Sequence, residues 1–255
     1  MKRAASCLLL AVCAAVAAAC ILTRVGYDYA DTLARLTLAS YLDLDSAQTE
    51  DLKPRIARLH HWHRMNELPA YAALLRTASQ RAAKGITQED VAWGLGTVRA
   101  RYRRFAAKAV EDATPVLATL APAQLAALEH KFAERNEKYA KEFLSSDDKK
   151  RRSAQRKRML ERFRDFAGEL TSEQEARIEG FAVAHERHVA LRFEDRQRWQ
   201  RDLVALLREH HRPHELGERL AEMFNKPELR RSEEFIREDK RWDEELGRLI
   251  ADLDR

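Results

Sequence analysis

Leu170-Thr171-Ser172-Glu173-Gln174 decides the fold, because similar five-residue stretches recur along the chain. The other copies are Leu44-Asp45-Ser46-Ala47-Gln48, Leu120-Ala121-Pro122-Ala123-Gln124 and the looser Ile86-Thr87-Gln88-Glu89-Asp90. Threonine and aspartate are good helix N-caps, and a glutamine three residues later can close a capping box. The leading Leu or Ile can pack as a hydrophobic staple, and Pro122 suits a first helical position. Each copy therefore predicts the start of a helix.

The segments between these starts predict long helices. We expect helices over about 27–41, 46–64, 67–84, 88–112 and 122–144, and a basic helix that follows a break at 145–148 and ends at Ala167. A long helix after Thr171 could run unbroken to His211, and Pro213 and Pro227 open the last two. Pro54 should kink the second helix because it has no N–H to donate.

The composition agrees with a helical protein. The 255 residues include only eight glycines and six prolines, and no alternating β-branched run predicts a strand. Short loops favour antiparallel neighbours. The expected fold is an all-α antiparallel multi-helix bundle with long helices, over residues 27–255, with a subdivision near 145–148 left open.

The N-terminus has the pattern of a secretory signal. Met1-Lys2-Arg3 precedes an apolar run that ends in Val16-Ala17-Ala18-Ala19-Cys20. A cysteine at this place resembles a bacterial lipobox, which implies a signal peptide at 1–19, a lipidated tether at 20–26 and palmitate on Cys20. Ile21 after the cysteine, rather than Asp, implies by analogy the outer membrane, with the domain facing the periplasm.

Three alternatives to this lipid anchor remain open. The alanines could form an ordinary cleavage site, Cys13 could be the lipidated residue, or the segment could stay as an uncleaved anchor. The last requires a span from a run of 16 residues, Ala4 to Ala19, where about 20 are needed. Since Cys7, Cys13 and Cys20 are the only cysteines, cleavage before Cys20 leaves no pair for a disulfide.

Positive charge is concentrated in two stretches. Removing 1–19 takes two of the 46 basic residues and none of the 41 acidic ones, which leaves a net charge of only +3. The candidate residues for an anionic partner are Arg99, Arg101, Arg103, Arg104, Lys149, Lys150, Arg151, Arg152, Arg156, Lys157 and Arg158. They could bind anionic lipid headgroups, lipopolysaccharide phosphates or acidic unfolded proteins. The alternative is a solvated face paired with Glu134, Glu137 and Glu142. Nucleic acid is not expected as a partner in this compartment.

The sequence contains no motif for catalysis or for a cofactor. Histidines cluster at His60 and His63, at His185 and His188, and at 210–214, but no thiol or HExxH pattern supports a zinc site, so no metal is expected. A Ser-His-Asp arrangement and a glycine-rich phosphate loop are both missing. We expect a protein that is not an enzyme. Its four tryptophans, together with Tyr27 and Tyr29, are expected in the core rather than in a ligand cage.

Two family resemblances follow from these motifs. The Leu-Thr-x-x-Gln pattern resembles the LTxxQ motif of the Spy/CpxP group of periplasmic chaperones and stress regulators. A closer likeness is to a family of uncharacterised proteobacterial lipoproteins. It is carried by Cys20, Tyr41-Leu42-Asp43-Leu44 before Gln48, Trp62-His63-Arg64 followed by Glu67-Leu68-Pro69, the second glutamine motif, and Arg196 with Trp199-Gln200. This likeness implies a lipid-anchored, all-helical periplasmic domain.

The functional hypotheses follow from the anchor and the segregated charge. The first is a lipid-anchored helical binding module of the cell envelope, with chaperone-like binding of unfolded proteins as one form. The alternative is a structural or assembly lipoprotein that docks on one outer-membrane partner. A metal-dependent enzyme is the remote third hypothesis.

Overall fold

The structure is a computed structural model that describes residues 26–209 and 212–254. All regular elements in these residues are helices, which confirms the all-α prediction. They are α2 (Ala30–Leu42), α3 (Ser46–Ala82), α4 (Gln88–Leu117), α5 (Pro122–Phe143), α6 (Asp148–Ala167), α7 (Ser172–Ala184), α8 (Glu186–Arg208), α9 (Pro213–Asn225), the 3₁₀ turn η1 (Pro227–Leu229) and α10 (Glu233–Leu253).

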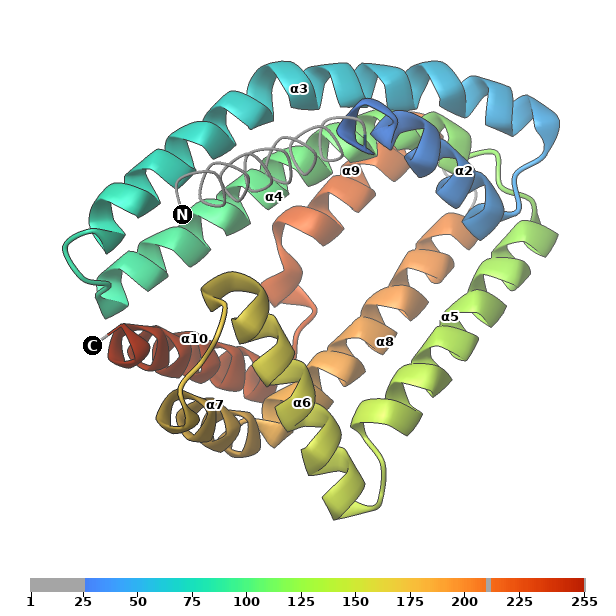
Figure 1. Ribbon diagram of the computed structural model, residues 1–255. Helices are drawn as coiled ribbons and strands as arrows, with labels where there is room; N and C mark the ends of the chain where they lie inside the picture. The colour runs from blue at the N-terminus through green and yellow to red at the C-terminus, as the bar shows by residue number, and fades with distance from the viewer. Residues whose placement is uncertain (1–25, 210–211, 255) are drawn as a thin grey trace, which may run out of the picture.

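The helices form three packed groups (Figure 1). The long helices α3 and α4 form a hairpin, with α2 against α3. Helix α8 packs on α5, and α9 packs on both α4 and α8. Helices α6, α7 and α10 make the third group, which joins the others through contacts of α10 with α4 and α8 and of α6 with α5. The space-filling view shows a hollow between these groups, near the middle of the face drawn.

The repeated stretches start helices as the sequence predicts. The Asp45 carboxylate accepts from the backbone N–H of Gln48 at 2.8 Å, and the Gln48 side chain accepts from the Asp45 N–H at 3.1 Å. Thr171 and Gln174 form the same reciprocal box. Ala121 has no polar side chain, so only the glutamine half is present there, at 2.8 Å. In the looser copy Asp90 rather than a glutamine completes the box with Thr87.

The glutamines of two copies also meet in space. Gln48 of α3 and Gln124 of α5 donate to each other, with N···O distances of 3.1 and 2.6 Å. Gln48 donates further to the carbonyl of Thr119, and Gln124 to that of Asp43. The capping motifs therefore join the starts of α3 and α5 as well as beginning each helix.

The predicted boundary between residues 64 and 67 is wrong, because α3 continues through Pro54 and Pro69. Glu67 is fully buried in α3 and is paired with Arg101 and Arg104 of α4. Packing along α4 thus holds the helix together where proline alone predicts an end. Helix α4 likewise continues beyond its expected end at 112, through Pro115 to Leu117.

In the C-terminal half, the structure answers one point that the sequence left open and corrects one prediction. The helix after Thr171 is not continuous to His211: it divides at His185, where the backbone leaves helical geometry, and α8 ends at Arg208. Pro227 opens only a 3₁₀ turn, and the last helix starts at Glu233 with Ser232 as its N-cap. Sequence periodicity missed the break because His185 has ordinary helical neighbours, whereas its ring is bonded to α10.

Two apolar clusters make up most of the core. The larger joins α4, α5, α8 and α9 through Val110, Leu120, Leu125, Leu128, Val204, Leu206, Leu207, Leu216, Leu220 and Met223. The second joins α6, α7 and α10 through Leu160, Ile178, Phe181, Leu246 and Leu249. The tryptophans are partly buried, but Tyr29 is exposed, so its expected core position is wrong.

The signal-peptide and lipidation predictions, Cys20 included, fall on residues that lie outside those described. Among the described helices, none combines the length and the apolarity that crossing a membrane requires.

Candidate functional site

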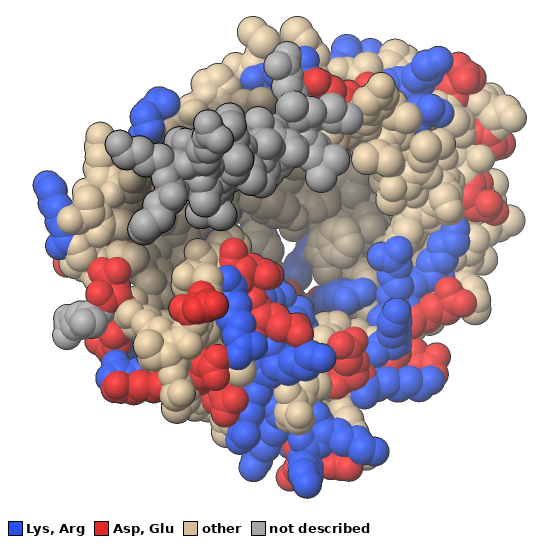
Figure 2. Space-filling model, in the orientation of Figure 1, with Lys and Arg blue, Asp and Glu red and all other residues tan. Residues whose placement is uncertain are grey.

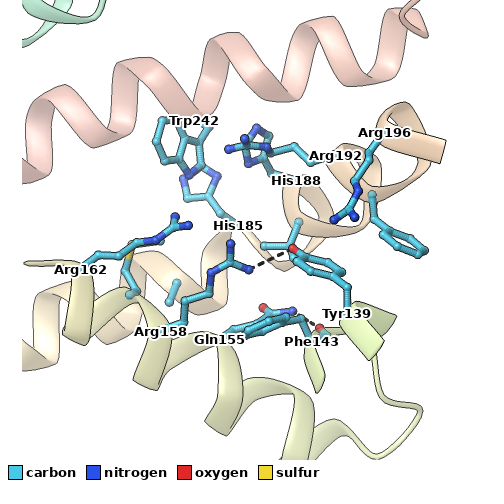
Figure 3. Close-up of a pocket in the computed structure, with 14 residues that line it drawn as sticks. Tyr139, Phe143, Gln155, Arg158, Arg162, His185, His188, Arg192, Arg196 and Trp242 are labelled. Atoms are coloured by element: carbon cyan, nitrogen blue, oxygen red, sulfur yellow. Dashed lines mark hydrogen bonds between the residues drawn. The ribbon is translucent and has the colours of Figure 1, made fainter. Parts of the chain in front are cut away.

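A cavity of about 230 Å³ lies where α5, α6, α7, α8 and α10 meet (Figure 3). It borders the second apolar cluster, since Met159 and Trp242 belong to both. Its lining contains no aspartate or glutamate: it consists of Tyr139, Phe143, Gln155, Arg158, Met159, Arg162, Ala182, His185, His188, Val189, Arg192, Phe193, Arg196 and Trp242. We call this cavity the arginine pocket.

Four guanidinium groups enter the arginine pocket from two helices. Arg158 and Arg162 come from α6, and Arg192 and Arg196 from α8, each pair spaced by four residues on one helix face. Within the described part of the chain, none of the four has a carboxylate oxygen within 4.0 Å. Arg162 is exposed, but partial desolvation, and then the charges of Arg158 and Arg192, lower the pKa of its guanidinium. The four arginines therefore make the pocket positive, with Arg162 and Arg192 exposed to solvent and Arg158 and Arg196 half-buried.

Aromatic rings form the wall beside these arginines. The Arg158 guanidinium lies over the Phe143 ring, 4.5 Å from its centroid, and donates to the Tyr139 hydroxyl at 3.1 Å. Tyr139 stacks on Phe193 of α8, and Arg196 also lies over the Tyr139 ring. These contacts orient the charges toward the cavity without neutralising them, because an aromatic face attracts a cation but carries no net charge.

Two buried histidines form the inner end of the pocket. His185 Nε2 lies 2.9 Å from a Glu245 oxygen, and His188 Nε2 lies 3.0 Å from Asp239 Oδ1. Trp242, between these two acids on α10, stacks on His188. Both histidines are 2% exposed. Burial lowers the pKa of His185, although Glu245 opposes this effect.

Two polar atoms in the lining are buried without a hydrogen-bond partner among the described residues. They are Nδ1 of His185 and Oε1 of Gln155. The Gln155 amide nitrogen donates to the carbonyl of Phe143 at 2.9 Å, which fixes the orientation of that amide. Since a buried polar group without a partner costs about 1–3 kcal/mol, these two atoms mark places that a ligand can complete.

The first predicted basic stretch lies on α4, away from the arginine pocket. Arg99 makes a bidentate pair with Asp243 of α10, at 2.6 and 2.7 Å. Arg101 and Arg104 lie next to the buried carboxylate of Glu67, whereas Arg103 is exposed. The structure thus places three of these four arginines in contacts that join helices.

The second predicted stretch gathers on α6 and is largely paired. In Figure 2, Lys and Arg are dense over the lower part of the molecule, where Figure 1 places α6. The pairs are Lys150 with Asp147, Arg151 and Arg152 with Glu186, Arg156 with Glu179 and Lys157 with Glu161. Lys149 is exposed. The expected partners Glu134 and Glu137 instead pair with His130 and Lys141 of their own helix. Arg158 alone of these residues lines the arginine pocket.

Sequence reasoning missed most of the pocket, namely Arg162, Arg192, Arg196 and the place of His185 and His188 in its lining. Arg-x-x-x-Arg spacings occur at 158–162 and 192–196, but also at 99–103, 152–156, 208–212 and 237–241, so the spacing does not single out the pocket. Among the described residues, no three histidine or acidic side chains converge as metal ligands would.

The comparison with known proteins gives one match. A family model described as "Family of unknown function (DUF6279)" matches residues 40–237, which is more than half of the chain. The matched span contains the whole lining of the arginine pocket except Trp242. No curated protein and no solved structure matches the chain.

Proposed function

Because the chain belongs to DUF6279, a family of unknown function, we propose its function from its own site. The protein is a lipid-anchored binding module of the cell envelope that recognises an anionic group of its partner in the arginine pocket. It performs no chemistry on this partner. Cys20 carries the anchor, on the outer membrane and facing the periplasm.

The observation that supports binding most strongly is the set of four guanidinium groups without carboxylate partners. Other arginines of α6 pair with Glu186 and Glu179. The pocket arginines therefore differ from their neighbours on the same helix in having no acidic partner among the described residues. Arginine charges that converge and remain unpaired destabilise a protein by mutual repulsion. An anionic partner removes this repulsion, and arginine forms bidentate hydrogen bonds with anions.

The lipid anchor rests on the lipobox-like sequence before Cys20. Several acyl chains on one cysteine tether a protein stably, because each buried CH₂ contributes about 0.8 kcal/mol. We expect Cys20→Ser to abolish palmitate labelling in cells and to leave an unprocessed precursor. Labelling that persists in this variant would show that another residue carries the lipid.

Photo-crosslinking in cells tests the binding function. A photoreactive phenylalanine analogue replaces Phe143, which lines the arginine pocket, and in the control it replaces Phe166, which is 94% exposed on the same pair of helices α5–α6. We expect an adduct from position 143 that is absent from position 166. It should disappear when Arg162 and Arg192 are both changed to Gln.

The mass of the adduct separates the forms of this function. One adduct of defined mass indicates a dedicated envelope partner, whereas a broad ladder of protein adducts indicates chaperone-like binding. No adduct from position 143, or the same adduct in the arginine variant, would contradict a partner that enters the arginine pocket.

A further inference from the structure

We propose that the group bound in the arginine pocket is a phosphomonoester, rather than a carboxylate. This inference rests on the proposed function and assigns the chemistry of its ligand. It is drawn from the charge of the pocket, from its two unsatisfied polar atoms and from its size.

The charge of the pocket calls for more than one negative charge. Four guanidinium groups line it and no acid does. A carboxylate brings a single charge, whereas a phosphomonoester carries about −1.5 to −2 at neutral pH and has three terminal oxygens. Its oxygens can each meet a different guanidinium, so donors on α6 and α8 can be satisfied together.

The unsatisfied atoms call for a hydrogen-bond donor on the same ligand. Because Glu245 can only accept, His185 donates through Nε2, and Nδ1 of the neutral ring is then an acceptor. Gln155 Oε1 is an acceptor as well. An ionised carboxylate has no proton to offer to either atom. The phosphomonoester dianion that meets the charge of the pocket has no proton to offer either, so the donor for these two atoms has to lie in the adjoining group of the ligand, as a hydroxyl would.

The size and the walls of the pocket describe the rest of the ligand. The cavity of about 230 Å³ is smaller than a typical pocket for a whole drug-sized molecule, which measures about 300–1,000 Å³. It therefore takes a phosphate together with a small adjoining group. The rings of Tyr139, Phe143 and Trp242 offer apolar surface to that group. The phosphate can come from a lipid headgroup or from a soluble phosphomonoester.

Calorimetric titration of the full-length chain in detergent tests this inference. The probes are phenyl phosphate and benzoate, which share the ring and differ in the anionic group. We expect phenyl phosphate to bind at least about tenfold more tightly. Arg192→Gln and, independently, Arg196→Gln should each weaken its binding about tenfold or more, because each removes charge-assisted hydrogen bonds. Arg103→Gln, on exposed α4 surface, should change nothing.

A competition experiment distinguishes the two sources of phosphate. Mixed micelles with phosphatidic acid should displace phenyl phosphate if the natural ligand is a lipid headgroup, and micelles with phosphatidylcholine should not. Phosphate binding without this displacement assigns a soluble phosphomonoester. Benzoate binding as tightly as phenyl phosphate would overturn the inference and leave the proposed function standing. Failure of both probes would overturn the inference, and a missing crosslink at position 143 would then remove the proposed function too.

Discussion

Replacing Gln48 by alanine should destabilise the protein far more than an ordinary surface substitution. The Gln48 side chain is 8% exposed, and it holds the Asp45 N–H, the Thr119 carbonyl and the amide of Gln124. Truncating it to alanine leaves these groups without a hydrogen-bond partner where little water can replace it, which lowers the free energy of unfolding by about 1–3 kcal/mol. For a chain of this length, 2 kcal/mol corresponds to a decrease of roughly 4–8 °C in Tm.

The matched control is Gln80→Ala. Gln80 is an exposed residue of the same helix α3, so its replacement involves the same change in helix propensity and should alter stability by less than about 0.5 kcal/mol. Both Tm values are read from circular dichroism at 222 nm, the helix band.

The double variant Gln48→Ala/Gln124→Ala then isolates the contact between the two glutamines. Each single variant loses this contact, but the double variant loses it only once. We therefore expect the double variant to be more stable than the sum of the single effects predicts, by about 0.5–1.5 kcal/mol. Strict additivity, or a Gln48→Ala protein as stable as Gln80→Ala, would refute the view that the capping motifs join α3 to α5.

Three further predictions concern the core, a turn and pH. Leu220→Ala should cost about 2–5 kcal/mol in chemical unfolding, because Leu220 is 1% exposed in the larger cluster; a smaller loss than 1 kcal/mol would speak against that core. Gly85 has a φ of 88°, so Gly85→Ala should lower the free energy of unfolding by about 1–2 kcal/mol. Gly180→Ala, in open space on α7, should raise it by about 0.5–1 kcal/mol. Equal effects of the two substitutions would contradict the left-handed turn at Gly85. Burial lowers the pKa of His185 below its usual 6.5, so the unfolded chain takes up this proton at a higher pH than the folded chain, and stability should fall as the pH drops through 6.5. His185→Gln should make the denaturant midpoint depend less on pH between 7.5 and 5.5. An unchanged pH dependence would contradict a neutral buried ring.

Local signals predicted the helix starts, because a cap acts within one turn. Asp45, Thr171 and Pro122 all begin helices where their side chains lead one to expect it. The boundary between 64 and 67 and the end of the fourth helix at 112 were predicted wrongly, since whether a helix continues depends on what packs beside it. Burial of Glu67 against α4 is such a contact, and it joins residues far apart in the sequence.

The arginine pocket could be predicted only in part, because it too depends on contacts between residues far apart in the sequence. The spacings 158–162 and 192–196 can be read from the chain, but not that α6 and α8 present them to one cavity. In a chain with 46 basic residues, the sequence also does not tell which arginines are paired. Arg152 and Arg158 belong to one basic run, yet Arg152 meets Glu186 and Arg158 lines the pocket.

The central claim is that the arginines of the pocket serve a ligand and not the fold. The most direct test is the thermal unfolding of the ligand-free protein, comparing the wild type with Arg162→Gln. Partial desolvation and the charges of Arg158 and Arg192 lower the pKa of the Arg162 guanidinium. Because Arg162 is exposed, solvent screens this repulsion, and removing the charge should leave Tm unchanged or raise it slightly. A clear decrease in Tm would contradict the account, because it would show that the Arg162 guanidinium stabilises the fold.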